Sequence, residues 1–344
     1  MKLHLRVQSF GNRETTMADI QEAFLHEQLL ERRERLEAAI ASSRADESLR
    51  QLLDEVDSAL ERMKAGGFGI CEACHETIEK DRLLADPLIR YCLDHLTAGQ
   101  RRALEEDLQL ASQLQKGLLP KRHTVFAGWE TWYYYRPLTL VSGDYCDVVT
   151  YQNESEDVYF ALGDVSGKGV AACMLMSQLH AIIRTLIASG MTLQAMVERA
   201  SRVFCQSTLS SLFATLVLVR AGQAGEIEVC NAGHCPALLV QGGAVKELGA
   251  TGVPLGLFCE GVYPTQDAEM ACGDTLFLYT DGISEARSAN EAEYGVERLK
   301  QLVASSGAPT AQALVTACID DLDVFRAGAP LLDDLTIMAI RRVT

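Results

Sequence analysis

Short apolar segments in the C-terminal two thirds of the chain each meet an aspartate, and this pattern constrains the fold more than any other feature. The acidic positions stand in four contexts: Ser142-Gly143-Asp144; Asp164 after Tyr159-Phe160-Ala161-Leu162; Thr280-Asp281-Gly282 after Leu276-Phe277-Leu278-Tyr279; and Asp333-Asp334 before Leu335-Thr336-Ile337-Met338. An isolated Asp-Gly is typical of a turn, but the repeated placement at strand boundaries predicts that the carboxylates converge. Converging carboxylates repel one another, and hard divalent cations remove that repulsion. The sequence therefore predicts a centre of two or more Mg²⁺ or Mn²⁺ ions.

The segments between these aspartates predict a mixed fold of strands and helices. Strands are predicted at Val158–Leu162, Phe213–Val219, Glu226–Cys230, Ala237–Val240, Thr275–Tyr279 and Leu335–Ile340. Helices are predicted at Val170–Ser189, Leu193–Ser207, 296–304 and 310–323. Strand runs grouped around a helical pair indicate α+β layering rather than a strict βαβ repeat, and the Gly-x-Gly fragments do not form a dinucleotide-binding fingerprint.

The motifs together resemble the PPM-type metal-dependent phosphatases of the SpoIIE/RsbU branch, over about residues 120–342. The resemblance is carried by Ser142-Gly143-Asp144-Tyr145, Gly163-Asp164-Val165-Ser166-Gly167-Lys168-Gly169, Asn231-Ala232-Gly233-His234-Cys235-Pro236, Thr280-Asp281-Gly282 and Asp333-Asp334-Leu335-Thr336. It implies a β-sandwich flanked by helices and a protein serine/threonine phosphatase in which a metal-activated water attacks phosphorus directly. It also implies that the substrate is a phosphorylated anti-anti-sigma (STAS) protein of a partner-switching pathway.

The same resemblance assigns roles to the aspartates. Asp164 bridges two metal ions, and the backbone carbonyl of Val165 binds one of them. Asp281 and Asp333 complete the cluster, whereas Asp144 binds a metal directly or through water.

Further residues around this cluster are candidates for supporting roles. Asp334 is counted among the metal ligands, and Arg136 and Lys168 are candidates to grip the phosphate. His234 is either a proton donor or a residue that stabilises its loop. Ser142 stands where the branch usually has glycine.

A second metal site is predicted near the N-terminus. Cys71 and Cys74 form a Cys-x2-Cys pair, and after 17 residues Cys92 and His95 form a Cys-x2-His pair. Two such pairs on two turns supply the tetrahedral set that Zn²⁺ prefers, and four protein ligands leave no position for water. We therefore expect a structural zinc site, with His75 as a weaker alternative to His95.

The segment Ala59-Leu60-Glu61-Arg62-Met63-Lys64-Ala65-Gly66-Gly67-Phe68-Gly69-Ile70-Cys71-Glu72-Ala73-Cys74 resembles the DksA/TraR zinc-finger family, and the likeness extends over about residues 17–98. That family usually has cysteine where this chain has His95. The resemblance implies a helical hairpin before a small zinc ribbon, and RNA polymerase as a partner contacted by acidic residues at the hairpin tip, here Asp46 and Glu47.

Helical periodicity supports this organisation. Apolar residues recur at helical spacing from Met17 to Ile40 and again from Leu49 to Met63, which predicts a hairpin. A further helix is predicted from about Ala103 to Leu119, where Pro120 ends it. This helix resembles the linker that carries dimerisation and regulation in the SpoIIE/RsbU branch, although a passive spacer explains it equally well. The predicted division is 1–16 disordered or preceding a true start at Met17, 17–98 zinc module, 99–120 linker and 121–344 phosphatase domain.

Composition limits the remaining partners. A net charge of −16 over 344 residues argues against general affinity for nucleic acid or anionic membranes. The N-terminal residues contain no signal-peptide apolar segment, and no apolar run of about 18 residues is evident, so we expect a cytoplasmic protein. The 11 cysteines agree, since those outside the zinc motif are scattered singly and are expected to be reduced and buried.

Two other functions compete with a plain phosphatase. The chain is alternatively a non-enzymatic transcription regulator that binds RNA polymerase through its zinc module. In a third hypothesis, the zinc module senses a signal and regulates the phosphatase through the helix at 103–119. The concentration of unpaired aspartates favours an enzyme over a scaffold.

Overall fold

The computed structural model describes residues 25–26, 28–30, 32–37, 40, 47–95, 98–150, 157–208 and 212–344. The chain divides into two compact units, residues 1–105 and 106–344. The predictions made for residues 1–16, for Met17 and for Asp46 lie outside the described residues.

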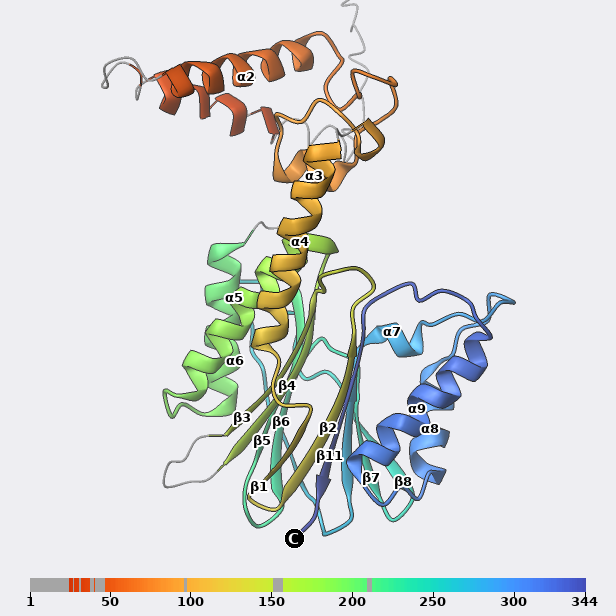
Figure 1. Cartoon of the computed structure of the whole chain (residues 1–344). Coiled ribbons are helices and arrows are strands. Elements are labelled where there is room, and N and C mark those ends of the chain that lie inside the picture. The colour runs from red at the N-terminus through yellow and green to blue at the C-terminus, as the bar shows by residue number, and fades with distance from the viewer. Residues whose placement is uncertain are drawn as a thin grey trace, which may run out of the picture. The chain divides into compact units, whose positions relative to one another are not determined.

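The first unit contains a helical pair and a small ribbon (Figure 1). The described residues between 25 and 40 are helical, and α2 runs from Glu47 to Lys64, as the periodicity predicts. The two helical segments share one apolar cluster, made of Leu29, Leu36, Val56, Ala59 and Leu60. The ribbon follows, with α3 at Lys80–Ala85 and the short helix η1 at Leu93–His95.

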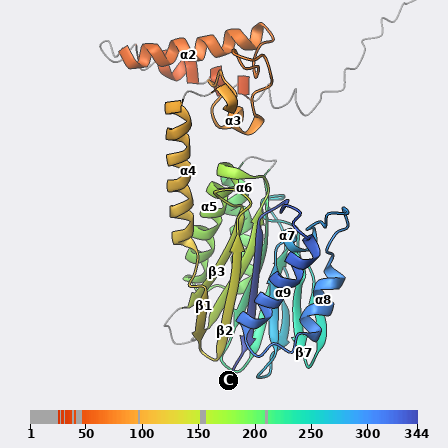
Figure 2. The same cartoon turned by 45° about the vertical axis from the view of Figure 1, so that its right-hand side comes forward.

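The second unit is a sandwich of two antiparallel sheets (Figures 1 and 2). The six-stranded sheet has the order β1-β2-β11-β10-β7-β8, and the five-stranded sheet has the order β3-β4-β5-β6-β9. The strands are β1 His123–Phe126, β2 Trp129–Arg136, β3 Asp144–Thr150, β4 Val158–Val165, β5 Ala214–Ala221, β6 Glu226–Ala232, β7 Ala237–Gln241, β8 Ala244–Leu248, β9 Gln266–Glu269, β10 Thr275–Tyr279 and β11 Leu335–Arg342. The six predicted strands are therefore confirmed, and five further strands complete the sheets.

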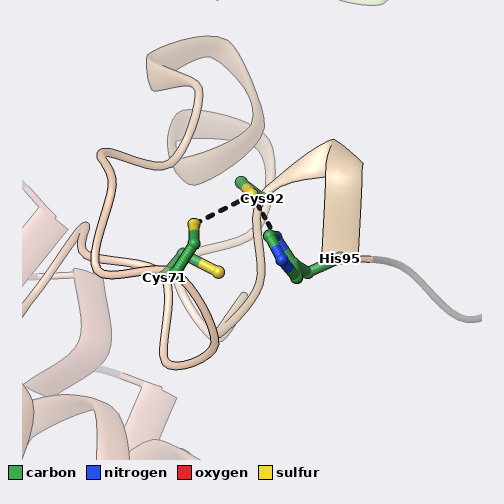
Figure 3. Close-up of side chains that lie close together, drawn as sticks. Cys71, Cys92 and His95 are labelled. Carbon is green, nitrogen blue, oxygen red and sulfur yellow. Dashed lines mark hydrogen bonds between the residues drawn. The ribbon is translucent and has the colours of Figure 1, made fainter.

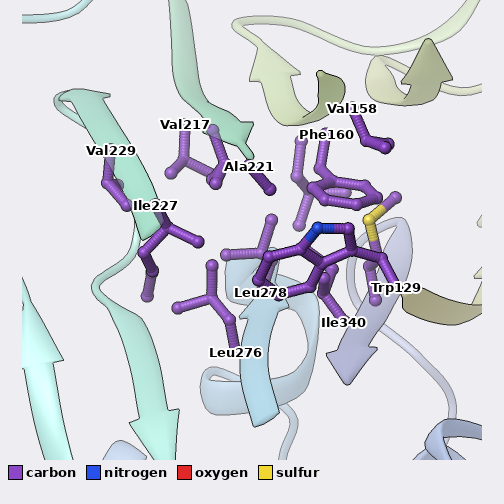
Figure 4. Packing of buried hydrophobic residues seen from close by; sticks show 14 of the residues in the cluster. Trp129, Val158, Phe160, Val217, Ala221, Ile227, Val229, Leu276, Leu278 and Ile340 are labelled. Atoms are coloured by element: carbon purple, nitrogen blue, oxygen red, sulfur yellow. The ribbon is translucent and has the colours of Figure 1, made fainter. Parts of the chain in front are cut away.

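Side chains from the facing surfaces of the two sheets form the central core (Figure 4). The indole of Trp129 in β2 lies edge-on against Phe160 in β4, with ring centroids 6.4 Å apart. Alternate residues of a strand point to opposite faces, so each sheet also presents an outer apolar surface that helices cover.

Helices close both outer faces. Helices α5, Gly169–Ile187, and α6, Leu193–Ser207, cover the five-stranded sheet. Helices α8, Val296–Ser305, and α9, Ala311–Arg326, cover the six-stranded sheet. The α+β sandwich flanked by helices is thus confirmed.

Helix α4, Ala98–Leu118, begins five residues before the predicted start and ends before Pro120 as expected. Its last turns belong to the second unit, where Leu118 packs against the cluster beneath α5 and α6. The one-turn helix α7, Asp281–Ser284, follows β10 directly.

Two sequence predictions need correction. Helix α5 is long and apolar enough to cross a membrane by length and composition, although we expected no such segment. Its apolarity has a simpler cause, because it has six buried residues, Ala172, Cys173, Met176, Leu179, Ile183 and Ile187, and the last four of these belong to the cluster that packs against the five-stranded sheet. The second correction concerns cysteine, since Cys205 and Cys259 are joined in a disulfide rather than scattered singly.

Candidate functional site

The two sheets bring the predicted aspartates together at one end of the sandwich. Asp144, the first residue of β3, is directly opposite Asp164 near the end of β4. Asp281 opens α7 just after β10, and Asp333 precedes β11, the neighbour of β10. Each sheet therefore supplies two of the four acidic positions.

Asp144 is held by hydroxyl groups from the opposite sheet. Its side chain is buried, with 1% of the residue exposed. The hydroxyls of Thr280 and Thr336 both donate to its Oδ2 atom, Thr280 at 3.1 Å and Thr336 in a short hydrogen bond. The other oxygen of Asp144, Oδ1, accepts neither of these two hydrogen bonds.

The carboxylates of the cluster are difficult to ionise together. Burial, followed by Asp281 and Asp333, raises the pKa of Asp164 to about 7. Burial and then Asp164 raise the pKa of Asp144 well above its usual range. Burial and then Glu285 raise the pKa of Asp281. The cluster thus favours bound cations, protons in the metal-free protein and metals when they are present.

The site fits a hard divalent cation. A side chain at Gly143 would place its Cβ 2.9 Å from the Val165 carbonyl oxygen and 3.3 Å from Asp164 Oδ1, so glycine keeps this space open. The donors that face it are carboxylate and carbonyl oxygens, which suit Mg²⁺ or Mn²⁺ rather than a softer metal. Asp144, Asp164, Asp281, Asp333 and the Val165 carbonyl are the groups that would hold the ions.

Asp334 makes different contacts from its neighbour Asp333. Its Oδ1 accepts a hydrogen bond from the Leu138 amide at 2.7 Å, and its Oδ2 accepts one from the Gly143 amide at 2.9 Å. Both oxygens anchor the segment that leads into Asp144, so the geometry favours a positioning role over the predicted role as a ligand.

The two candidate phosphate contacts differ in position. Lys168 lies beside the cluster, with Nζ 3.0 Å from Asp333 Oδ2 and 2.9 Å from the Leu332 carbonyl oxygen. Arg136 is the exposed last residue of β2, opposite Leu335. Lys168 is therefore the better placed cation for a group bound at Asp333.

His234 is connected to Asp164 through the Thr215 hydroxyl. Its Nδ1 is 2.8 Å from the Thr215 hydroxyl, which in turn lies 3.4 Å from the Asp164 carbonyl oxygen. Burial lowers the pKa of His234 to about 4, so the ring is neutral near pH 7 and is a poor proton donor. Its amide donates to Asn231 Oδ1 at 2.8 Å, and these contacts favour the loop-stabilising role.

Sequence reasoning did not single out Thr280, Thr336, Thr215 or Glu285. Thr280 and Thr336 adjoin or closely follow the aspartates in the motifs, so their position was a usable clue. Nothing in the sequence indicates that both hydroxyls converge on Asp144.

The last turns of α4 also reach this region. The Gln115 side chain, 3% exposed, donates to the Ser142 carbonyl oxygen at 2.6 Å and accepts from the Ser142 amide at 3.1 Å. The Ser142 hydroxyl accepts a hydrogen bond from the Asp144 amide at 3.0 Å. Helix α4 is therefore connected to a predicted metal ligand by two consecutive contacts.

The zinc motif forms a separate cluster in the first unit (Figure 3). The ligand atoms of Cys71, Cys74, Cys92 and His95 all lie within 4.8 Å of one another. Cys92 Sγ is 3.8 Å from Cys74 Sγ and 3.2 Å from His95 Nδ1. Three sulfurs and one imidazole nitrogen at this spacing fit a closed Zn²⁺ site, and the set contains His95 rather than His75.

Two protein-family sequence models match separate parts of the chain. The sequence model of the family described as stage II sporulation protein E (SpoIIE) matches residues 154–343. That of the prokaryotic DksA/TraR C4-type zinc finger matches residues 66–94 and so ends just before His95.

Individual relatives cover most of the second unit. Phosphoserine phosphatase RsbU of Bacillus subtilis is 25% identical over 249 residues, which span 71% of this chain and 72% of RsbU. Protein IcfG of Synechocystis is 24% identical over 272 residues, which span 69% of this chain and 41% of IcfG.

Solved structures share the fold. The SiaA-PP2C domain of Pseudomonas aeruginosa superimposes with a TM-score of 0.62 at 22% identity, covering 71% of this chain and 99% of that one. The RsbU and RsbW domains of a Mycobacterium tuberculosis protein give 0.55 at 28% identity, covering 64% of this chain and 61% of that one.

Proposed function

The chain belongs to the SpoIIE family of PPM-type protein serine/threonine phosphatases, and on this premise we propose that it hydrolyses phosphoserine or phosphothreonine in a regulatory protein by direct attack of water. The observation that carries the proposal is the cluster of Asp144, Asp164, Asp281 and Asp333 at the joined ends of two sheets, in which Asp144 is buried and the other three are partly exposed. A scaffold gains nothing from the raised pKa values of Asp144, Asp164 and Asp281, which burial and then neighbouring carboxylates cause, whereas a divalent-metal phosphatase requires such carboxylates.

The ions, Mg²⁺ or Mn²⁺ in this proposal, would supply an activated water and neutralise charge on the phosphoryl oxygens. The protein's own task is to keep the ligands ionised and fixed. Thr280 and Thr336 stabilise the ionised form of Asp144 by donating hydrogen bonds to it. Lys168, whose Nζ is paired with Asp333, would contact a phosphate oxygen of the bound substrate, and this pairing supports that proposal.

The proposed substrate is a phosphorylated STAS-type protein. This rests on the likeness to phosphoserine phosphatase RsbU and to a structure that contains RsbU and RsbW domains in one chain. A cytoplasmic location and a homodimer belong to the same proposal. Zn²⁺ is proposed for the cluster of Cys71, Cys74, Cys92 and His95, as a structural ion.

The test is Mn²⁺-dependent hydrolysis of a phosphoserine peptide by the whole chain. Asp164→Asn and Asp281→Asn are expected to abolish it, whereas Asp267→Asn, an exposed carboxylate in β9, is the matched control and retains it. If a folded wild-type chain shows no hydrolysis with Mn²⁺ or Mg²⁺, the proposal is wrong for this chain in isolation.

A second candidate function is binding to RNA polymerase, which the zinc-finger match at residues 66–94 motivates. The predicted hairpin tip includes Glu47, the first residue of α2. Capture of purified polymerase by the whole chain, lost on changing Asp46 and Glu47 to alanine, would support this function. Unchanged capture by that variant, or none by wild type, would count against it.

Regulation through α4 is a third proposal. The hydrogen bonds between Gln115 and Ser142 link this helix to the segment before Asp144. Deletion of residues 1–100 is expected to change the specific activity toward the phosphopeptide. Equal activity of the truncated and whole chains, with equal response to Mn²⁺, would refute it.

A further inference from the structure

The disulfide between Cys205 and Cys259 fastens a long loop to a helix. Cys205 lies in the last turn of α6, and Cys259 lies in the loop of residues 249–265 that connects β8 to β9. The Cα atoms are 5.4 Å apart, within the normal range for a disulfide, and 54 residues separate the two cysteines in sequence.

The base of this loop is held without the disulfide. Leu255 exchanges two backbone hydrogen bonds with Ala214, the first residue of β5. The buried Ser201 hydroxyl of α6 accepts hydrogen bonds from the Tyr263 hydroxyl at 2.8 Å and from the Gly256 amide at 3.3 Å. These contacts fix the two points where the loop reaches and leaves α6.

The tip between those points is far more exposed. Leu257 is 45% exposed, Phe258 is 59% exposed and Val262 is 68% exposed. The remaining described hydrogen bond of the tip to α6 is a long one, from the Ser201 hydroxyl to the Phe258 carbonyl oxygen at 3.4 Å. The disulfide is therefore the main restraint on the tip.

We propose that Cys205 and Cys259 form a reversible thiol–disulfide pair, a redox modification site that switches this loop tip between a fastened and a loose state. The oxidant is a low-molecular-weight disulfide of the glutathione class. Cys259 is exposed and Cys205 is partly buried, so the Cys259 thiolate is the more accessible nucleophile.

The exchange proceeds in two balanced steps. The Cys259 thiolate attacks the small disulfide, breaks its S–S bond, releases one thiol and forms a mixed disulfide. The Cys205 thiolate then attacks the Cys259 sulfur of that mixed disulfide and releases the second thiol. The two protein thiols lose two electrons and two protons in total, and the small disulfide is reduced to two thiols.

The fastened loop adjoins the candidate active site. The amides of Thr251 and Gly252 donate to the Asn231 carbonyl oxygen at 2.8 and 3.1 Å, and Asn231 also supports His234. A Cβ on Gly233 would lie 2.6 Å from the ring of Pro254, which shows how closely the two loops pack. Oxidation thus restrains the exposed apolar tip of a loop whose base packs against the segment of Asn231 and Gly233.

The first experiment equilibrates the whole, zinc-loaded chain with reduced and then oxidised glutathione, followed by alkylation and peptide mass mapping. We expect a cross-linked peptide pair containing Cys205 and Cys259, the loss of these two alkylatable thiols, and their return on reduction. Cys272→Ser, which removes an exposed free cysteine, is the matched control and should leave the cross-link unchanged. Separate glutathione adducts on Cys205 and Cys259 without the cross-link would overturn the proposal.

Hydrogen exchange then measures the loop itself. Peptides covering residues 257–262 are expected to take up deuterium more slowly in the oxidised protein than in the reduced protein or in Cys259→Ser. Cys259→Ser changes an exposed loop position, so it is the preferred variant if Cys205→Ser folds poorly. Equal exchange in the oxidised and reduced forms would refute the switch, and neither measurement depends on phosphatase activity.

Discussion

Replacement of Asp164, the proposed central metal ligand, is expected to stabilise the metal-free protein. The perturbation is Asp164→Asn, studied in buffers without Mg²⁺ or Mn²⁺. Burial and the neighbouring carboxylates raise the pKa of Asp164 from 3.8 to about 7. Between these values the folded protein keeps the proton that the unfolded chain has lost, so stability falls as the pH rises through this window.

The size of the effect follows from the two pKa values. A rise from 3.8 to about 7 corresponds to about 4 kcal/mol, at about 1.4 kcal/mol for each tenfold change in proton affinity. Asparagine carries no charge at any pH and avoids this cost. Asp164→Asn is therefore expected to raise the free energy of unfolding by up to about 4 kcal/mol at pH 8, and by only about 2 kcal/mol at pH 5.

Urea denaturation followed by tryptophan fluorescence is the assay. Both tryptophans of the chain, Trp129 and Trp132, lie in β2, so the signal reports the second unit rather than the zinc module. Asp267→Asn is the control, because an exposed carboxylate should change the free energy of unfolding by less than about 0.5 kcal/mol. An Asp164→Asn variant no more stable than wild type at pH 8, or a gain equal at pH 5 and pH 8, would refute the reasoning.

Mn²⁺ should narrow the difference in the free energy of unfolding between wild type and the variant. Wild type gains about 2.7 kcal/mol at a free metal concentration 100 times its Kd, whereas the variant lacks the proposed central ligand and gains less. The same titration thus separates a ligand from a residue that is only buried.

Three further perturbations test the surroundings of the two metal sites. Thr336→Val removes a hydroxyl that donates to Asp144, so it should weaken Mn²⁺ binding about 10- to 100-fold in calorimetric titration. Thr131→Val is the control, because that hydroxyl donates to the Thr124 carbonyl oxygen in β1 and should not affect Mn²⁺ binding. Equal Mn²⁺ affinities of the two variants would contradict the positioning role of Thr336. Gln115→Leu leaves the backbone groups of Ser142 unpaired and should lower the free energy of unfolding by about 1–3 kcal/mol in urea; no loss would mean that water replaces the side chain. His95→Ala should reduce zinc content after dialysis while His95→Cys retains it; full retention in both would exclude His95 as a ligand.

The sequence predicted those parts of the fold that have a distinct apolar pattern. Helix α6 at Leu193–Ser207 and strand β10 at Thr275–Tyr279 have the predicted bounds, because the apolar residues recur at helical spacing in α6 and form one continuous run in β10. Strand β2 was missed because its apolar residues lie on both faces and are interrupted by Glu130 and Thr131: Trp129 and Tyr133 belong to the core between the sheets, and Trp132 packs under the helices. Its aromatic residues therefore show no alternation of apolar and polar positions.

The sequence predicted the aspartates of the candidate site but not the side chains that hydrogen-bond to them. The aspartates were found because they recur at strand boundaries. A divalent cation was then predicted because carboxylates that lie close together repel one another and hard cations remove that repulsion. The two hydrogen bonds to Asp144 span 136 and 192 residues of sequence, and the pairing of Cys205 with Cys259 spans 54, so no local pattern records them. Asp334 illustrates the same limit, since only the structure shows that its two oxygens bind backbone amides.

The arrangement of the cluster links catalysis to the cohesion of the sandwich. Asp144 and Asp164 come from one sheet, and Asp281 and Asp333 lie at the end of the other, so their mutual repulsion acts to separate the sheets at this end. Hydrogen bonds from Thr280 and Thr336 to Asp144 oppose that separation in the metal-free protein. Divalent cations bound between the same carboxylates would replace this repulsion by attraction. They would therefore hold the two sheets together at the same place where the proposed reaction occurs. We therefore expect this end to open locally more often in the absence of metal, with the remainder of the core intact, and hydrogen exchange of β3 and β10 with and without Mn²⁺ would measure the difference.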